Sequence, residues 1–236
     1  MKKYKLTTET LQFAGRTLHR IKAVKDFDSI KAGEFGGWIE NEKNLSQDDN
    51  AWIYGDAMVF DNAEVYDNAK VYGNANVSGN ANVSGNAKVY GIANVFGNAN
   101  VFGNAKVYGN ANVFGYAEVY DNAKVYGNAN VSGNAEVSCN AEVSDYAKVY
   151  GNAAIKGDAK VHDAVDYIVF KNFWSSGRYF TWTSSNNKWS VGCFYGTGEE
   201  LIKKAYADSE KSGREYERVV RYVESILADE KKEKSN

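Results

Sequence analysis

The sequence predicts a mainly β protein built around a three-sided parallel β-helix of about six coils, each of 18 residues. Three observations predict this fold. Alanine occurs at every sixth position, nineteen times in succession, from Ala51 to Ala159. Isoleucine or valine follows two residues after each of these alanines, from Ile53 to Val161. Other residue types repeat every 18 positions, as lysine does at 70, 88, 106 and 124, so three sides of six residues complete one coil.

The hexad A-x-V-[YFS]-G-N explains how one side of the coil is made. Residues two apart point to the same face of a strand, so Ala and Val both face the interior. Gly and Asn most readily adopt positive φ and can turn the corner to the next side. Because six fits neither 3.6 nor 7, the period excludes helices. Parallel strands stack ~4.8 Å apart, which predicts a rod on the order of 30 Å long.

The composition of the 236 residues agrees with such a ladder of strands. The chain contains no proline, a residue that cannot donate a hydrogen bond within a sheet. Its 28 basic and 30 acidic residues leave a net charge of −2, so neither a nucleic acid nor an anionic membrane is an expected partner. No apolar run reaches the ~18 residues of a membrane span. We therefore expect a cytoplasmic protein.

The repeats resemble the hexapeptide-repeat family, and the match covers residues 51 to 162. The resemblance implies a left-handed parallel β-helix. In the acyltransferase branch of that family Gly commonly follows the aliphatic residue directly, whereas here Tyr, Phe or Ser does. The string GNAKVYGNA and the upstream segment IKAGEFGGWIENEKNLSQDDNAWIY look like uncharacterised hexapeptide-repeat proteins of bacteriophages and prophages. This likeness implies a bacterial cell or a phage-infected host cell as the setting.

Three domains are expected: an N-terminal cap over residues 1–50, the β-helix over 51–162, and an α+β domain with a helical tail over 163–236. A solenoid exposes strand edges at both ends, and natural ones cover them. Residues 3–27 alternate in polarity around Ala14-Gly15-Arg16 and predict a β-hairpin. A plug of large apolar residues is expected over the first coil, formed by Trp38, Ile39, Leu45 and Trp52.

The C-terminal domain is predicted to have the order β-β-β-α-α. Its strands are expected at 165–173, 178–184 and 188–195, where aromatic and β-branched residues gather. A first helix should open at Thr197, which is followed by acidic residues. A second helix is predicted from about Ser212 to Glu230, with its apolar residues along one stripe.

Outward aromatic and lysine columns are candidates for an interface. Stacked aromatic rings could simply stiffen a solenoid with a thin core. They could also form a flat wall that packs against another copy of the chain in a homodimer or homotrimer. The residues assigned to this wall are Tyr72, Tyr90, Tyr108, Tyr126, Phe96, Phe102, Phe114, Lys88 and Lys106. Carbohydrate binding along the tyrosine column is a further alternative.

A second candidate surface lies in the C-terminal domain, where Trp, Tyr and Arg gather. These residue types dominate binding hot spots, although a tryptophan can equally serve as the core of a small sheet. We predict recognition of a host protein or a small ligand by Trp174, Ser175, Arg178, Tyr179, Trp182 and Trp189.

Acyl transfer is the enzymatic alternative that the family resemblance implies, because such enzymes hold an acyl donor and deprotonate the acceptor with a histidine. The chain has two histidines, and His162 occupies an outward position of the last hexad. Acetyl-CoA would be the cofactor in that case, and no cofactor is otherwise expected. A zinc site of the carbonic anhydrase type needs three histidines, so no metal is predicted.

These features favour a non-enzymatic binding or scaffold protein encoded by a phage or prophage. It would oligomerise through the β-helix and recognise a host protein or small ligand, including a component of host defence, through its C-terminal domain. An acyltransferase that uses His162 is the alternative.

Overall fold

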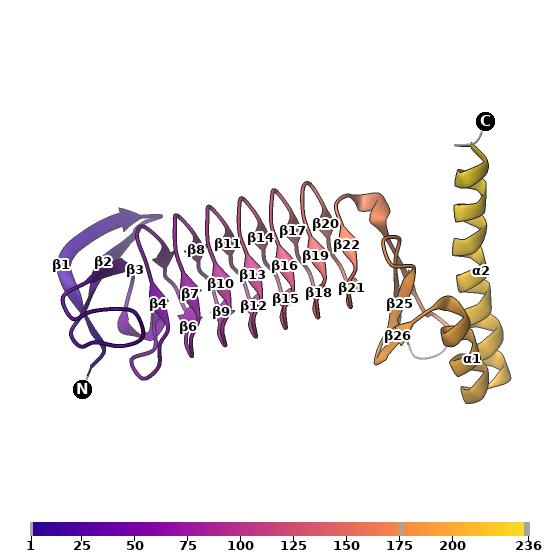
Figure 1. The fold of residues 1–236 in the computed structure, drawn as a ribbon, viewed down its shortest axis with the longest axis horizontal. Helices are drawn as coiled ribbons and strands as arrows, with labels where there is room; N and C mark the ends of the chain where they lie inside the picture. The colour runs from indigo at the N-terminus through magenta and orange to yellow at the C-terminus, as the bar shows by residue number, and fades with distance from the viewer. Residues whose placement is uncertain (1, 175–176, 234–236) are drawn as a thin grey trace. The chain divides into compact units, whose positions relative to one another are not determined.

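The computed structural model describes residues 2–174 and 177–233, which belong to two compact units, Met1–Asp166 and Tyr167–Asn236. The first unit is a parallel β-solenoid of about seven turns with a hairpin at its N-terminal end (Figure 1). The second unit is an antiparallel sheet with two helices. The predicted fold class is confirmed, with about one more coil than the hexads alone indicate.

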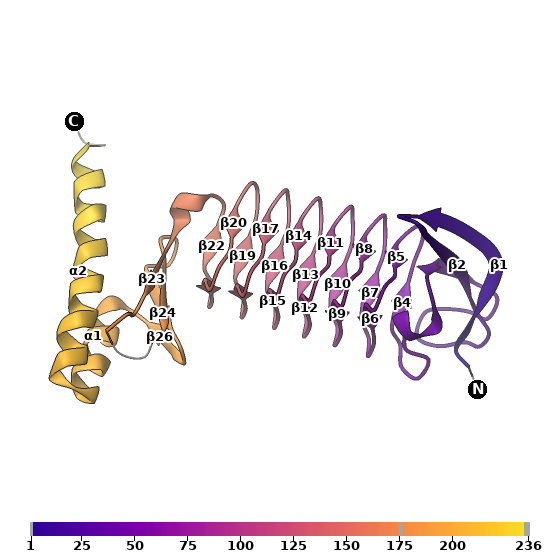
Figure 2. The same ribbon diagram turned by 180° about the vertical axis from the view of Figure 1, so that it is seen from behind.

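Nineteen two-residue strands, β4 to β22, form the three sides of the solenoid, and their stacked rungs are visible from both directions in Figures 1 and 2. We name each side by its commonest outward residue. The lysine face consists of β4 (Trp52–Ile53), β7 (Lys70–Val71), β10 (Lys88–Val89), β13 (Lys106–Val107), β16 (Lys124–Val125), β19 (Glu142–Val143) and β22 (Lys160–Val161).

The asparagine face consists of β5 (Met58–Val59), β8 (Asn76–Val77), β11 (Asn94–Val95), β14 (Asn112–Val113), β17 (Asn130–Val131) and β20 (Lys148–Val149). The glutamate face consists of β6 (Glu64–Val65), β9 (Asn82–Val83), β12 (Asn100–Val101), β15 (Glu118–Val119), β18 (Glu136–Val137) and β21 (Ala154–Ile155). Each strand pairs in register with the strand 18 residues away, so like positions stack in columns.

The interior of the solenoid is formed by the small and branched residues of the hexads, with Ile39 and Leu45 added in the first coil. Each of these alanines and each Val or Ile is at most 1% exposed. Burial of this apolar surface stabilises the rod by roughly 25 cal/mol per Å² removed from water.

The corners between the faces depend on residues that tolerate positive φ. Gly79 is one of them, with φ +69° and the backbone of the next coil close above it. Asparagine side chains stabilise the corners and the asparagine face, because many of their amide nitrogens donate to the side-chain oxygen of the asparagine one coil farther on, as in Asn94 to Asn112 at 3.1 Å.

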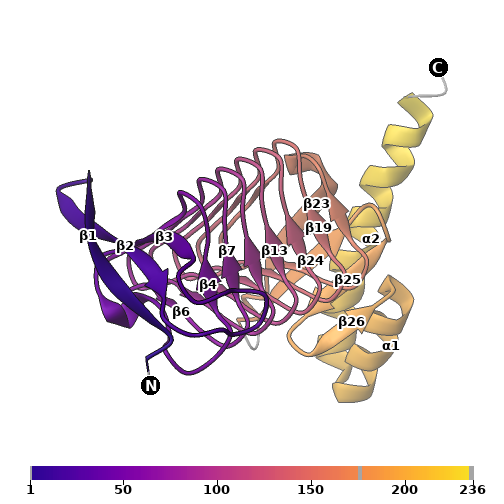
Figure 3. The same cartoon turned by 60° about the vertical axis from the view of Figure 1, so that its left-hand side comes forward.

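The N-terminal cap begins with a hairpin of β1 (Tyr4–Phe13) and β2 (Arg16–Ala23), which continues into β3 (Phe35–Ile39) (Figure 3). β3 then pairs in parallel with β5, and Leu45 bridges to Val65. The first coil therefore starts before the first hexad, which explains the additional turn. The predicted plug is confirmed for Ile39 and Leu45, which face inward in register with Val59 and Val65. Trp38 and Trp52 are also buried, but they occupy outward positions in register with Met58 and Lys70 and pack against the N-terminal cap instead.

The second unit contains four strands rather than the three predicted. They are β23 (Tyr167–Lys171), β24 (Tyr179–Thr183), β25 (Lys188–Val191) and β26 (Phe194–Gly196). The run expected at 188–195 folds back on itself at Gly192, whose φ is +56°. The helices α1 (Gly198–Asp208) and α2 (Glu210–Glu233) follow, and Thr197 caps α1 in a capping box with Glu200.

Candidate functional site

A polar cluster closes the outward column of the lysine face at its C-terminal end. This column holds the residue that follows each inward Val or Ile, and it reads Tyr54, Tyr72, Tyr90, Tyr108, Tyr126, Ser144 and His162. The change from tyrosine to serine places a side chain without a ring next to the imidazole of His162.

Three side chains of this cluster contact one another. His162 Nδ1 lies 2.7 Å from Ser144 Oγ and 3.1 Å from Asp145 Oδ2. Ser144 Oγ donates in turn to Asp145 Oδ2 at 3.3 Å. Ser144 is buried, whereas the side chain of His162 is 49% exposed. One edge of the imidazole ring therefore contacts Ser144 and Asp145, and the rest of the ring is accessible to solvent.

The solenoid ends here, and this makes the Asp145 carboxylate available to His162. Other aspartates at corner positions use their carboxylates to accept a backbone N–H one coil farther on, as Asp61 does from Gly79 at 3.1 Å. The equivalent N–H for Asp145 is that of Asp163, which donates instead to Asp166 at 3.0 Å. The short 3-10 helix Ala164–Asp166 thus satisfies this amide and leaves Asp145 to the histidine.

These contacts assign the ring hydrogen of neutral His162 to Nδ1. The Asp145 carboxylate can only accept, and the Ser144 hydroxyl uses its hydrogen on Asp145, so both neighbours of Nδ1 act as acceptors. The Nε2 lone pair is then available to take a proton. A carboxylate that holds one imidazole nitrogen orients the ring so that the other nitrogen can act as a general base.

The chain is similar to the uncharacterized acetyltransferase YdcK of Escherichia coli strain K12, with 39% identity over 62 residues. This match covers 23% of the chain and 19% of the relative. The chain therefore spans about a fifth of the length of the protein that it matches. No family model matches the chain.

A charged pair on the same face joins the rung that precedes Ser144 to the rung one coil before it. Lys124 donates to Glu142 at 2.8 Å, and this hydrogen bond lowers the pKa of the Glu142 carboxyl below its ordinary value. Tyr126 also donates to Glu142, at 3.2 Å. Glu142 is thus held as a carboxylate by its own neighbours.

The aromatic wall predicted from the sequence is divided among three faces. The tyrosines at 72, 90, 108 and 126 stack on the lysine face with ring centroids 4.7–4.9 Å apart. Phe96 and Phe114 stack on the asparagine face, and Phe102 stacks with Tyr120 on the glutamate face. The prediction of one continuous wall is therefore wrong, because the 18-residue period places residues six apart on different sides.

The C-terminal residues predicted to bind a partner also separate into groups. Trp182 and Trp189 are 3% and 2% exposed and lie in the core of the second unit, so we assign them a packing role in place of the predicted binding role. Trp174 packs partly buried against that core, while Tyr179 is half-buried and Arg178 is exposed. Ser175 lies outside the described residues. A binding role for Trp174, Arg178 and Tyr179 stays a prediction.

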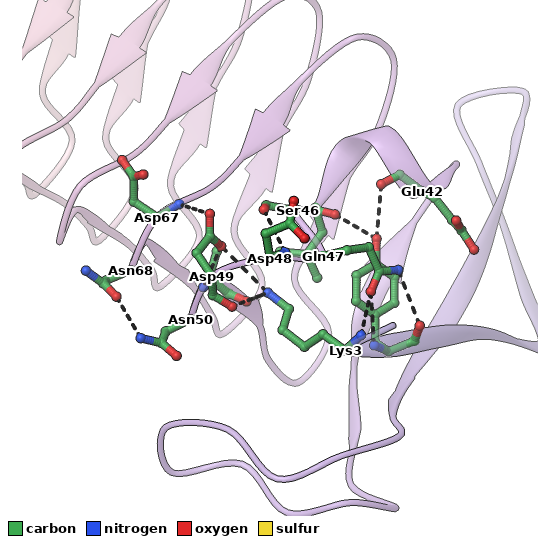
Figure 4. Close-up of polar contacts among 12 residues, drawn as sticks. Lys3, Glu42, Ser46, Gln47, Asp48, Asp49, Asn50, Asp67 and Asn68 are labelled. Atoms are coloured by element: carbon green, nitrogen blue, oxygen red, sulfur yellow. Dashed lines mark hydrogen bonds and ion pairs between the residues drawn. The ribbon is translucent and has the colours of Figure 1, made fainter. Parts of the chain in front are cut away.

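A second polar cluster surrounds the buried ammonium group of Lys3 in the first coil (Figure 4). Its Nζ donates to the carbonyl oxygens of Asp49 at 2.9 Å and Ala51 at 2.8 Å. Gln47 accepts from the Lys3 backbone N–H, and Asp49 accepts from that of Asp67. Since these groups satisfy one another, we assign this cluster a structural role.

The sequence analysis identified His162 but missed Ser144 and Asp145. The spacing was a usable signal, because Ser144 precedes His162 by 18 residues and must stack beside it. The role of Asp145 had no local signal, since it depends on how the chain leaves the last coil. Within the described residues there is neither a cluster of three potential metal ligands nor a helix long and apolar enough to span a membrane.

Proposed function

We propose that this protein transfers an acyl group from a thioester such as acetyl-CoA to a hydroxyl or amine, with His162 as the general base. The observation that carries the proposal is the contact of His162 Nδ1 with Asp145 and Ser144 at 3.1 and 2.7 Å, which leaves Nε2 to accept a proton. The short match to an uncharacterized acetyltransferase supports the same chemistry.

In the proposed reaction, Nε2 takes the proton of the acceptor as its oxygen or nitrogen bonds to the acyl carbon. The carbon–sulfur bond then breaks, and the thiolate leaves and recovers a proton from the imidazolium. Asp145 stabilises the positive ring in the transition state.

The test is release of free thiol from acetyl-CoA in the presence of a panel of hydroxyl and amine acceptors. Loss of a general base typically lowers the rate 10²–10⁴-fold, so His162→Gln should reduce kcat by about that factor. Asp145→Asn should reduce it less, because the base is retained but poorly oriented. His19→Gln is the matched control, since His19 lies on β2 at the other end of the unit.

Binding of the donor provides an independent readout. Millimolar acetyl-CoA should raise the melting temperature of the wild type and of the His162→Gln protein alike. Absence of stabilisation by the donor, or equal thiol release by the wild type and His162→Gln, would contradict the proposal.

Self-association is a second candidate function, favoured by the exposed apolar residues of the asparagine face. Ile92 and Phe96 are 57% and 39% exposed, and Tyr116 at the adjoining corner is 65% exposed. The outward positions of this face from Asn76 to Ser132 are asparagine, serine and phenylalanine, without a charge. Two copies can appose such faces without burying like charges. The predicted phage origin, host-protein partner and cytoplasmic location stay proposals that rest on the sequence.

A further inference from the structure

The tyrosine stack on the lysine face is interrupted at its N-terminal end. Tyr72 and Tyr90 are parallel, with an interplanar angle of 3° and centroids 4.7 Å apart. Tyr54 instead lies nearly perpendicular to Tyr72, at 86° and 6.3 Å. At this break the surface contains a hollow of about 380 Å³, lined by Tyr54, Lys70, Tyr72 and Lys88.

The edge of this hollow is formed by the N-terminal cap. Trp52 takes the place of a lysine in the first rung, and Phe27 packs edge-on against it at 5.3 Å. The same loop carries Asp28, whose carboxylate accepts from Lys70 Nζ at 2.8 Å. One of the two lysines that line the hollow is therefore already neutralised by the protein.

The other lysine is not neutralised. Within the described part of the chain, Lys88 has no carboxylate at ion-pair distance, and its side chain is exposed. Its neighbours in register are Lys70 and Lys106, which are also cations. Stacked ammonium groups repel one another, so an anion beside Lys88 would relieve an unfavourable interaction as well as form a new pair.

The rest of the lining is aromatic. The rings of Tyr54 and Tyr72 present an apolar surface on which a flat ring can pack, either offset-stacked or edge to face. The volume lies in the lower part of the range for small-molecule sites, which suits one or two fused rings with a short substituent.

We propose that this hollow binds a small ligand that combines a flat aromatic ring with an anionic group. The ring packs against Tyr54 and Tyr72, and the carboxylate or phosphate pairs with Lys88. The hollow lies five coils from His162, about 24 Å at ~4.8 Å per coil, so the site is separate from the proposed catalytic residues.

Calorimetric titration with four probes tests the proposal and distinguishes two sources of such a ligand. AMP represents a nucleotide and 2-naphthoate an aromatic acid, whereas adenosine lacks the anion and inorganic phosphate lacks the ring. We expect saturable binding of AMP, of 2-naphthoate or of both, and at least tenfold weaker binding of adenosine and phosphate. The probe that binds more tightly identifies the source.

Variants locate the site. Lys88→Gln and Tyr72→Leu should each weaken binding of the tighter probe about tenfold, and the loss caused by Lys88→Gln should shrink at high salt. Lys106→Gln is the matched control, because it removes the next cation of the same row outside the hollow and should change affinity less than twofold. Absence of saturable binding by both ring-bearing anions, or equal effects of Lys88→Gln and Lys106→Gln, would overturn the proposal.

Discussion

The ammonium group of Lys3 is buried in the first coil, at the corner that leads to the first hexad. Leu45 and Ile53 are eight residues apart where the hexads would place them six apart, so this corner contains two extra residues. The carbonyl of Asp49 in this corner and that of Ala51, the first hexad alanine, both accept from Lys3 Nζ, and Lys3 is 1% exposed. Burial, opposed in part by Asp49, lowers the pKa of Lys3 to about 8.

This pKa predicts a particular dependence of stability on pH. Between pH 8 and about 10.5 the folded chain has released the Lys3 proton and the unfolded chain still holds it, so stability rises with pH in this window. The gain is complete above pH 10.5 and is lost as the pH falls through 8. Relative to Lys3→Met, the free energy of unfolding of the wild type should rise by about 3 kcal/mol across the window.

Urea unfolding at four pH values from 7.5 to 10.5 measures this difference. Lys2→Met serves as the control, because Lys2 is exposed and pairs with Glu42 at the surface. A wild-type curve that runs parallel to that of Lys3→Met over the whole window would refute the assignment.

The packing between successive coils differs along one column of corner glycines in the solenoid. Gly79 and Gly151 occupy the same corner column and have the same φ of +69°. A Cβ at Gly79 would lie 2.8 Å from the amide nitrogen of Gly97 in the next coil, whereas a Cβ at Gly151 would have no atom within 4 Å. The difference arises because no further coil stacks on Gly151.

Alanine substitutions separate the two reasons for glycine at these corners, the positive φ and the close backbone of the next coil. Gly151→Ala should lower the free energy of unfolding by about 1 kcal/mol, the cost of a left-handed conformation for a residue with a Cβ. Gly79→Ala should lower it by about 2–3 kcal/mol, because the neighbouring backbone must also shift. Thermal or urea unfolding monitored by circular dichroism checks the ranking, and equal losses would show that close stacking contributes nothing.

The three faces determine how the whole molecule can associate. The lysine face carries a row of cations, the glutamate face carries Glu64, Glu118 and Glu136, and the asparagine face is uncharged over its central rungs. Self-association through the asparagine face should give a molar mass above that of one chain, 26.1 kDa, when light scattering is measured at micromolar concentration.

Introduced charges identify the face in contact. The double variant Phe96→Glu/Phe114→Glu should be monomeric, since it would bury four carboxylates at the contact between two copies. Phe102→Glu is the control, because it removes a ring from a similar stack on the glutamate face. A monomeric wild type would exclude the association altogether.

Much of the fold followed from the sequence, while the candidate site followed only in part. The hexads determine the inward columns, the corners and the number of sides, because these depend on periods of six and 18 that any neighbouring coil must match. The tyrosine and lysine columns were predictable for the same reason, and so was the position of His162. The same period also separates the phenylalanines, because Phe96 and Phe102 are six residues apart and therefore belong to different faces.

The tertiary structure alone decided the features that arise where the repeat stops. Asp145 turns to His162 because the amide that it would otherwise bind is satisfied by Asp166. Lys3 fills a corner that no repeat anticipates, and Tyr54 turns away from its column beside the cap. A repeat determines every position that has a neighbour above and below it. At the two ends one neighbour is missing, and nonlocal packing decides which groups pair.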